Sequence, residues 1–413
     1  MKRLYMGLLV SIIALVCIFS ARRASAVLAG DAAPPLTAAA APLANGNIGG
    51  YIEQVNDVAL AIEANGRIHA LWTGVLNPYF KAFAFYSTST DGVNWTPYQV
   101  LNYRQAYEPQ IVVDDVHHRV HLAYRSNYDG LVYHSVTNGI VSAPTMLDSF
   151  GGVSPRLAVD ATTGFVYAVW QQGSWYPLDD GLTSVWRERT WYAYWNGSAW
   201  SGRMRKINDG DTCYPSIAAA PGGRVMLAWF QRCSQTAGGA TDPGEPNVPR
   251  TAYGDSDPNK FPLRQAVSAF YTMPEKDDSI FLTYSPGDDK FYLAAEHLMW
   301  PGHSIIYRYT WQNGAWSAPL DLLMNTDKWA FPVYIGAASN LAQVAYVYNY
   351  DYGLQMRTES NGVLGAPQSL ADYLSARGYA GTPQGFFTDR AGNLHMSVVG
   401  TKNGTAGFYY VRP

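Results

Sequence analysis

The chain has 413 residues, of which 48% are hydrophobic and 15% are charged, and its formal net charge is -3. This apolar content excludes an intrinsically disordered protein, and together with the length it predicts a globular protein with a large buried core. No stretch carries the dense lysine and arginine clusters that bind phosphate backbones, so we expect no nucleic-acid partner.

Residues 1–26 are typical of a secretory signal peptide. Two basic residues follow the first methionine, an apolar stretch covers 8–19, and Ala-Ser-Ala at 24–26 is a small-x-small cleavage site. We therefore expect a secreted, extracellular protein that begins near Val27 and has no membrane attachment after cleavage. Retention as an anchor stays open because two arginines follow the apolar stretch, which is shorter than the roughly 20 residues of a bilayer span.

A unit of strand, tight turn and strand recurs seven times along the chain. It is clearest at 108–124, 154–170 and 214–230, as in "SPRLAVDATTGFVYAVW". Successive copies are 46 to 63 residues apart, and a period of this length indicates a repeat architecture. The copies align on Asp57, Pro109, Pro155, Pro215, Asp278, Pro332 and Pro383. We interpret the recurring proline as the first residue of a strand, where no ladder hydrogen bond is lost.

A second hairpin follows the unit in most copies, as in "YRYTWQNGAWSAPLDL" at 307–322, where Asn-Gly marks the turn. Two hairpins per period make four antiparallel strands, and such sheets repeated around an axis form a β-propeller. The fold class is therefore all-β, with seven blades. The last repeat contains only three strands, so we expect the segment at 40–45 to supply the fourth. This divides the chain into a signal peptide (1–26), an Ala/Pro-rich linker (27–39) and one propeller domain (40–413).

Trp95, Trp200 and Trp316 share one position just after the turn of this second hairpin. We expect their indoles to fill the gap between blades. The turn "STDGVNW" from Ser89 resembles the Asp-box, or BNR repeat, of sialidase-like propellers, although it is one residue shorter. The repeated Trp and Asn-Gly turns also resemble lectin propellers. Asp-boxes are structural turns, so the resemblance implies the fold and not the chemistry.

Long connections are expected on one face of the disc, at 171–190, 230–250 and 296–304, while the turns on the other face are short. Long loops on a rigid scaffold often carry function, so we expect the ligand site there. Planar aromatic side chains could stack on sugar rings, and arginines could hold carboxylates in two hydrogen bonds. The aromatic candidates are Trp175, Tyr176, Trp186 and Trp300, and the polar ones are Arg125, Arg156, Arg187, Arg189, Arg232 and His297. Packing within a loop and solvated surface arginines are the alternatives.

Cys213 and Cys233 are the two cysteines beyond the signal peptide. If the hairpin turns at 221–224, the two residues face each other across the strand ends. We therefore expect a disulfide that holds the long connection after the second strand.

The function expected from these features is recognition of an extracellular glycan through the long-loop face, by a monomer with no cofactor and no metal ion. The alternatives are a sialidase-like glycoside hydrolase, a polysaccharide lyase or a platform for protein interactions. Resemblance to sialidases implies three arginines, a tyrosine nucleophile with a glutamate, and an aspartic acid. The first repeat, "EQVNDVALAI", has no arginine at the position expected for that family, and Arg156 in the third repeat is the nearest analogue. Glu296 and Tyr350 are the candidate catalytic residues, and the sequence does not assign them to each other as partners.

Overall fold

The computed structural model describes residues 54–412 apart from several internal segments. Those segments are 77–80, 103, 150, 178–183, 202–204, 207–211, 232–247, 255–260, 262, 268–279, 300–302, 324–329, 339–340 and 351–352. The chain divides into the units Met1–Ala39 and Ala40–Pro413, and every element below belongs to the second. The expected signal peptide, linker and closing strand, together with Arg232, Cys233, Asp278 and Trp300, lie outside the described residues.

Blades one to four are antiparallel sheets whose strands follow one another in chain order. Blade one contains β1 (Gln54–Ile62), β2 (Ile68–Leu76), β3 (Lys81–Ser89) and β4 (Gln99–Asn102). Blade two contains β5 (Ala106–Asp114), β6 (Arg119–Ser126), β7 (Gly130–Thr137), β8 (Ile140–Val141) and β9 (Thr145–Asp148). Blade three contains β10 (Val153–Val159), β11 (Val166–Pro177), β12 (Ser184–Trp195) and β13 (Arg205–Lys206). Blade four contains β14 (Thr212–Ala220), β15 (Arg224–Gln231), β16 (Val248–Gly254) and β17 (Leu263–Ala266).

Blades five to seven repeat this order. Blade five contains β18 (Ile280–Ser285), β19 (Lys290–Met299), β20 (His303–Gln312), β21 (Ala315–Trp316) and β22 (Leu320–Leu323). Blade six contains β23 (Ala330–Ala337), β24 (Gln343–Tyr350), β25 (Gly353–Ser360), β26 (Val363–Leu364) and β27 (Gln368–Ser369). Blade seven contains β28 (Tyr379–Thr388), β29 (Leu394–Lys402) and β30 (Thr405–Val411) among the described residues. Where two short strands end a blade, both pair with the third strand, so they share the outer position.

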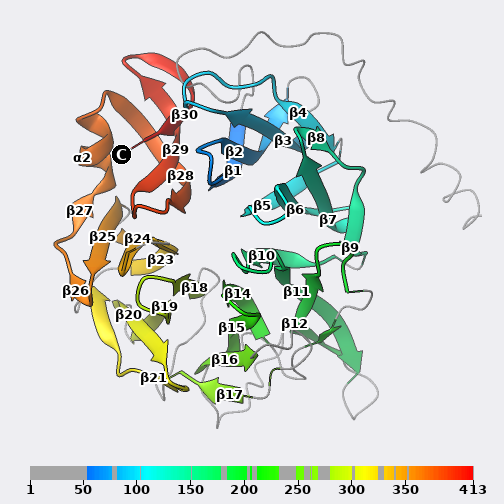
Figure 1. Ribbon diagram of the computed structural model, residues 1–413, viewed down its shortest axis with the longest axis vertical. Coiled ribbons are helices and arrows are strands. Elements are labelled where there is room, and N and C mark those ends of the chain that lie inside the picture. The colour runs from blue at the N-terminus through cyan, green and yellow to red at the C-terminus, as the bar shows by residue number, and fades with distance from the viewer. Residues whose placement is uncertain are drawn as a thin grey trace, which may run out of the picture. The chain divides into compact units, whose positions relative to one another are not determined.

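The seven sheets stand in a ring, with the first strand of each nearest the axis (Figure 1). Each first strand contacts the first strand of the next blade, and β28 contacts β1, so the ring is closed. The prediction of an all-β, seven-bladed propeller is therefore confirmed. The apolar core is divided among the seams between blades, since each large cluster joins residues of neighbouring sheets, as Trp72 and Phe408 do across blades one and seven.

The repeated tryptophans are confirmed as packing residues of these seams. Trp95 is 1% exposed and meets Tyr410 of blade seven at a ring separation of 6.1 Å. Trp200 meets Tyr133 of blade two at 5.0 Å. In each case an indole from the outer hairpin of one blade reaches the third strand of the blade before it. The turn before Trp95 is held by Asp91, whose carboxylate accepts two backbone N–H groups.

The aligned prolines do not begin strands, contrary to the sequence prediction. Pro109, Pro155 and Pro215 lie inside β5, β10 and β14, and the pairing with the second strand shifts register across each of them. A β-bulge leaves its extra residue out of the ladder, so a proline there removes no ladder hydrogen bond. The repeat therefore marks a bulge in the strand that lines the axis.

Two of the predicted long loops are mostly strand. In blade three, β11 and β12 remain paired as far as Pro177 and Ser184, and in blade five β19 and β20 pair as far as Met299 and His303. Cross-strand pairing overrides the Gly, Pro and Asp content that favoured loops. The segment at 232–247 lies outside the described residues.

The predicted register of the two cysteines is wrong. Cys213 pairs with Phe230, because Ala220 pairs with Arg224 and the bulge between Cys213 and Ser216 then moves the register by one residue. The position that faces Cys213 is thus three residues before Cys233. Since Cys233 lies outside the described residues, the disulfide stays a prediction.

One short helix, α2 (Leu370–Ser375), follows β27 and was not predicted. Its N-cap is Ser369, whose hydroxyl accepts the backbone N–H of Asp372, and Leu370 and Leu374 are buried against blades six and seven. Within the described residues, no helix is long and apolar enough to cross a membrane.

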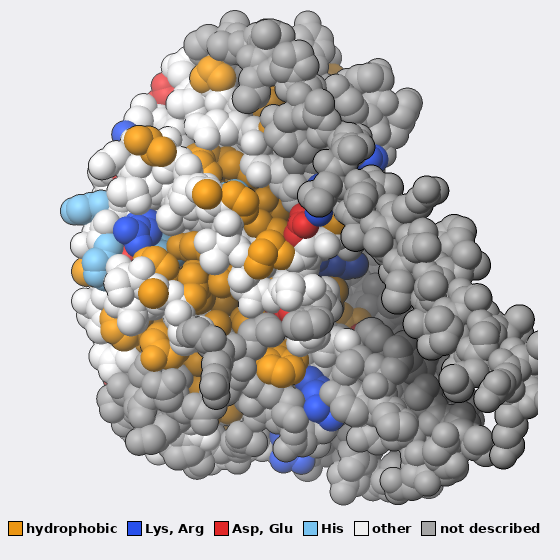
Figure 2. Space-filling view, turned by 90° about the vertical axis from the view of Figure 1, so that its right-hand side faces the viewer, with side chains coloured by type: hydrophobic (Ala, Val, Ile, Leu, Met, Phe, Trp, Pro, Cys, Tyr) orange, Lys and Arg blue, Asp and Glu red, His pale blue; other side chains and the backbone are white. Residues whose placement is uncertain are grey.

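The outer edge of blade two exposes apolar side chains, with Ile140 on β8 at 74% and Met146 on β9 at 42%. Figure 2 views the molecule from the side that carries this blade and shows apolar side chains among polar ones. Singly exposed apolar residues are common on soluble proteins, so this edge does not by itself indicate a site.

Candidate functional site at the channel on the propeller axis

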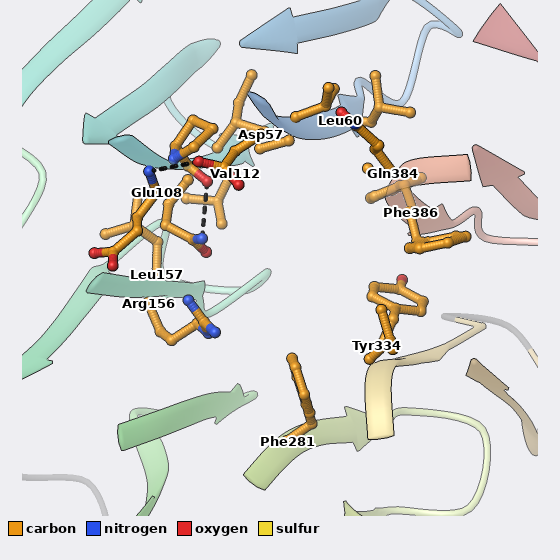
Figure 3. A pocket seen from close by; sticks show the side chains of 18 of the residues that line it. Asp57, Leu60, Glu108, Val112, Arg156, Leu157, Phe281, Tyr334, Gln384 and Phe386 are labelled. Atoms are coloured by element: carbon orange, nitrogen blue, oxygen red, sulfur yellow. Dashed lines mark hydrogen bonds between the residues drawn. The ribbon is translucent and has the colours of Figure 1, made fainter. Parts of the chain in front are cut away.

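A cavity of about 630 Å³ lies on the axis, and the first strands of all seven blades contribute to its lining. This volume is within the range of small-ligand sites. Figure 3 shows Asp57, Glu108 and Arg156 on one side of the cavity and Phe281, Tyr334 and Phe386 on the other. The cavity thus has a charged wall from blades one to three and a wall with aromatic side chains from blades five to seven.

The charged wall is built on an unusual backbone conformation. Glu108, Ser154 and Tyr214 each precede the aligned proline, and each has a positive φ between 51° and 54°. Non-glycine residues with positive φ are uncommon, and strained backbone is concentrated at functional sites.

Each of these three residues donates its backbone N–H to a side chain of the preceding blade. The N–H of Glu108 lies 3.4 Å from Oδ2 of Asp57, and that of Ser154 lies 2.7 Å from Oε2 of Glu108. The N–H of Tyr214 lies 3.1 Å from Oε1 of Gln171. A side chain of each of blades one to three therefore holds the bulge of the next blade, and in blades one and two that side chain, Asp57 or Glu108, also lines the channel.

Arg156 is the cation of this wall. Its Nη1 donates to the carbonyl of Pro155 at 2.9 Å, and its guanidinium lies 5.6 Å from the ring centre of Phe281. Burial lowers the pKa of Arg156, while the charges of Glu108 and Asp57 raise it. An arginine side chain stays protonated in proteins, so this wall keeps one positive charge beside two carboxylates.

Arg125 adds a second cation next to Glu108. Its Nη1 lies 3.8 Å from Oε1 of Glu108, and the guanidinium lies 5.6 Å from the ring centre of Tyr107. Of the predicted arginines, Arg125 therefore lies at the Glu108 carboxylate, and Arg156 lines the cavity within the electrostatic influence of Glu108. Asp57 and Glu108 were not predicted as site residues. Their position was a readable signal, because Asp57 occupies the aligned position and Glu108 directly precedes its proline.

The aromatic wall contains Tyr334 and Phe386, with ring centres 5.9 Å apart. The Tyr334 hydroxyl donates to Oγ1 of Thr388 at 3.2 Å and accepts the Thr388 backbone N–H at 2.8 Å. Burial raises the pKa of Tyr334 to about 12, so its phenol is neutral at physiological pH. Beside it, Oε1 of Gln384 is buried and accepts no hydrogen bond from the described residues. A buried acceptor of this kind calls for a partner such as water or a ligand.

The predicted aromatic and arginine candidates of blade three lie on strands. Trp175 and Trp186 are register partners, Tyr176 pairs with Val185, and Arg187 pairs with Ser174. The structure does not describe the side chains of the four predicted residues, Trp175, Tyr176, Trp186 and Arg187. Arg189 is half-buried and pairs with Gln172.

The blade-five candidates form a tight hairpin instead of a loop cluster. His297 pairs with Ile305, and its side chain is not described. Glu296 is 4% exposed and pairs with Ile306. Tyr350 ends β24 and packs against the core between blades five and six. Neither Glu296 nor Tyr350 lines the axial cavity.

A second cavity of about 540 Å³ lies between the hairpin turns of blades one and two, at the opposite ends of the strands. At its base, Nε2 of His69 lies 2.8 Å from Oε1 of Glu63, and Nδ1 lies 2.7 Å from the Tyr86 hydroxyl. Blade seven has the same carboxylate–histidine–tyrosine hydrogen-bond network in Asp389, His395 and Tyr410. Since the network recurs at equivalent positions of another blade, we interpret it as structural.

Comparison with known proteins is informative for the fold. No family model and no curated protein matches the chain. A polysaccharide lyase of family PL25, an ulvan lyase, has a TM-score of 0.50 and 12% identity and covers 77% of this chain and 82% of its own. A second structure of that enzyme contains -[GlcA(1-4)Rha3S]-.

Weaker likenesses include the Aleuria aurantia lectin, with a TM-score of 0.44, 13% identity and coverage of 77% and 96%. Another is the GH93 α-L-arabinofuranosidase of Fusarium graminearum, with a TM-score of 0.39, 10% identity and coverage of 74% and 92%. These scores carry no argument about function. The predicted likeness to sialidase-like and lectin propellers is confirmed as a likeness of fold.

Proposed function

We propose that this protein is a secreted, monomeric propeller that binds an extracellular polysaccharide at the axial channel. The observation that carries the proposal is the cavity of about 630 Å³, in which Asp57, Glu108 and Arg156 belong to one wall and Phe281 and Tyr334 to the other. Sugars present many hydroxyl groups on a ring with apolar C–H faces. Carboxylates accept hydrogen bonds from sugar hydroxyl groups, and a guanidinium donates hydrogen bonds to hydroxyl or carboxylate oxygens. Aromatic rings pack against the C–H faces of sugar rings.

The pre-organisation of the charged wall supports binding. Glu108 is held through Arg125 and the N–H of Ser154, and Arg156 is held through Pro155 and Phe281. Side chains that are already fixed lose little conformational freedom when a ligand arrives. The free acceptor of Gln384 adds a position for a ligand hydroxyl.

A second candidate is catalysis on the same polysaccharide, by elimination or hydrolysis. Two carboxylates and an arginine on neighbouring first strands are groups that could move a proton and stabilise a negative charge. The ulvan lyase shares the fold, which is support by analogy only. The neutral phenol of Tyr334 is already hydrogen-bonded to Thr388 in both directions, which disfavours Tyr334 as the base.

The test combines a glycan array of neutral and acidic polysaccharides with titration calorimetry on Arg156→Ala and Asp57→Asn. A hydrogen bond to a charged group contributes about 1.5–3 kcal/mol, so Arg156→Ala should raise Kd by roughly 10- to 150-fold. Arg224→Ala is the control, because Arg224 lies at the hairpin turn of blade four and pairs with Asp289. Unchanged affinity in both channel variants would contradict the placement of the site. New reducing ends or unsaturated products would favour the catalytic alternative.

A further inference from the structure

The turn between β6 and β7 carries a second feature on the face where the channel wall begins. Tyr128 is 65% exposed and is the one aromatic side chain that is strongly exposed in the described part of the chain. The other Phe, Tyr and Trp side chains that the structure describes are buried or half-buried. An exposed tyrosine ring presents a flat apolar face with a polar hydroxyl at its tip, which is a surface on which a sugar ring can stack.

The turn that carries Tyr128 is fixed on both sides. The backbone N–H of Asn127 donates to the carbonyl of Gln105 at 3.1 Å, and its side-chain amide donates to Oε1 of Gln105 at 2.9 Å. On the other side Arg104 pairs with Asp129 at 2.5 Å, and the Ser126 hydroxyl donates to Asp129 at 3.1 Å. The ring of Tyr128 is therefore exposed on a backbone that is already ordered.

The turn also leaves no room to shift toward its own sheet. Gly130 has a φ of +83°, and a Cβ at this position would lie 2.0 Å from the carbonyl oxygen of Asp148. Only glycine fits such a close approach at positive φ. The backbone at Gly130, two residues after Tyr128, is thus in close contact with the end of β9 at Asp148.

Tyr128 lies next to the charged wall of the channel. Ser126 pairs with Ala106 and Arg125 pairs with Tyr107, so the turn begins beside the residues that lead into Glu108. Tyr128 is three residues after Arg125, and a fully extended chain spans at most roughly 3.6 Å per residue, so their Cα atoms are at most about 11 Å apart. A chain of sugars that leaves the channel over blade two would pass this ring.

We propose that Tyr128 forms an outer subsite that stacks on one sugar ring of a polysaccharide whose other units occupy the axial channel. This inference rests on the proposed function and adds that the ligand is a chain which extends over blade two, not a single terminal sugar. The fixed turn supports it, because a rigid aromatic ring offers contact area at a low cost in conformational entropy.

The test compares Tyr128→Ala with Tyr128→Phe in the full-length protein. The probes are ulvan, xylan and β-glucan, with their oligosaccharides from disaccharide to octasaccharide, alongside the glycan array. Loss of an aromatic stacking contact worth about 0.5–1.5 kcal/mol should raise Kd for the long oligosaccharides by roughly 2- to 13-fold. Tyr128→Phe keeps the ring and should bind like the unmodified protein. The affinity for the disaccharide should not change in either variant.

Ile140→Ala is the matched control, since Ile140 is as exposed but lies on the turn of the outer hairpin of the same blade. Melting temperatures of the three variants should agree, because exposed side chains contribute little to stability. If the unmodified protein binds no glycan of the array, the proposed function fails and this subsite with it. If it binds and Tyr128→Ala keeps full affinity for long chains, the subsite alone is refuted.

Discussion

Trp95 offers the sharpest test of how the ring is held together. Its indole is 1% exposed, packs against Tyr410 of blade seven, and donates Nε1–H to the carbonyl of Gly92 at 3.3 Å. Replacing it with alanine should therefore weaken the seam that joins the first blade to the last. A hole at this seam affects the closure of the whole ring, since blades one and seven are far apart in the sequence.

The size of the effect follows from the buried area. A tryptophan buries roughly 150–250 Å², and at about 25 cal/mol per Å² this corresponds to about 4–6 kcal/mol. Residual compactness of the unfolded chain reduces the value by roughly 10–40%. Trp95→Ala should then lower the free energy of unfolding by about 3–5 kcal/mol, as is typical for buried aromatic residues.

The same change at Trp316 is the matched comparison. Trp316 occupies the equivalent position of blade five but is only half-buried, with its Nε1 3.1 Å from the Thr251 hydroxyl. Trp316→Ala should cost about half as much as Trp95→Ala, because the lost free energy scales with buried area. Denaturant unfolding of both variants measures the difference. Equal losses, or a smaller loss for Trp95→Ala, would refute the reasoning. Glycan binding should survive in either variant that folds.

Two further outcomes are expected. Arg308 of blade five and Glu359 of blade six form a buried ion pair at 2.5 Å. Arg308→Met leaves the Glu359 carboxylate buried without its cation, so it should lower the free energy of unfolding by about 3–5 kcal/mol, and the double variant with Glu359→Leu should recover most of that loss. A double variant no more stable than Arg308→Met would contradict this. Burial lowers the pKa of His69 and of His395 below 6.5, with their carboxylate partners opposing it. The unfolded chain therefore takes up protons before the fold does, so stability is complete above about pH 6.5 and declines as the pH falls below it. As the pH falls below about 6.5, the melting temperature of His395→Gln should fall less steeply than that of the unmodified protein. The melting temperature of His118→Asn, a change at an exposed histidine, should fall as steeply as that of the unmodified protein. The same pH dependence in both variants would count against the explanation.

Much of the fold was predictable because its signals are local and repeated. Asn313-Gly314 marks a hairpin turn by its backbone conformation alone, and seven similar periods imply seven similar sheets. The role of Trp95 was also predictable, since a large apolar residue at a repeated position of a repeated hairpin must face the neighbouring copy. These inferences need no knowledge of contacts between distant residues.

Strand pairing was less predictable. Trp175 and Trp186 read as loop residues next to Gly, Pro and Asp, yet they are register partners in an extended hairpin. Cys213 faces Phe230 because the bulge between Cys213 and Ser216 shifts the register of the two strands by one residue. A bulge is a compromise between two strands and the blade beside them, and no local pattern in one strand specifies its exact residue.

By itself, the sequence determined that this protein is a closed ring of seven β-sheets, because the number of copies and the alternation of apolar residues follow from residue order. Only the tertiary structure decided where a ligand site can form. Asp57, Glu108 and Arg156 are separated by about fifty residues each, and they meet because ring closure brings the first strands of different blades to one axis. Their chemistry is a property of that shared axis, which no single repeat contains.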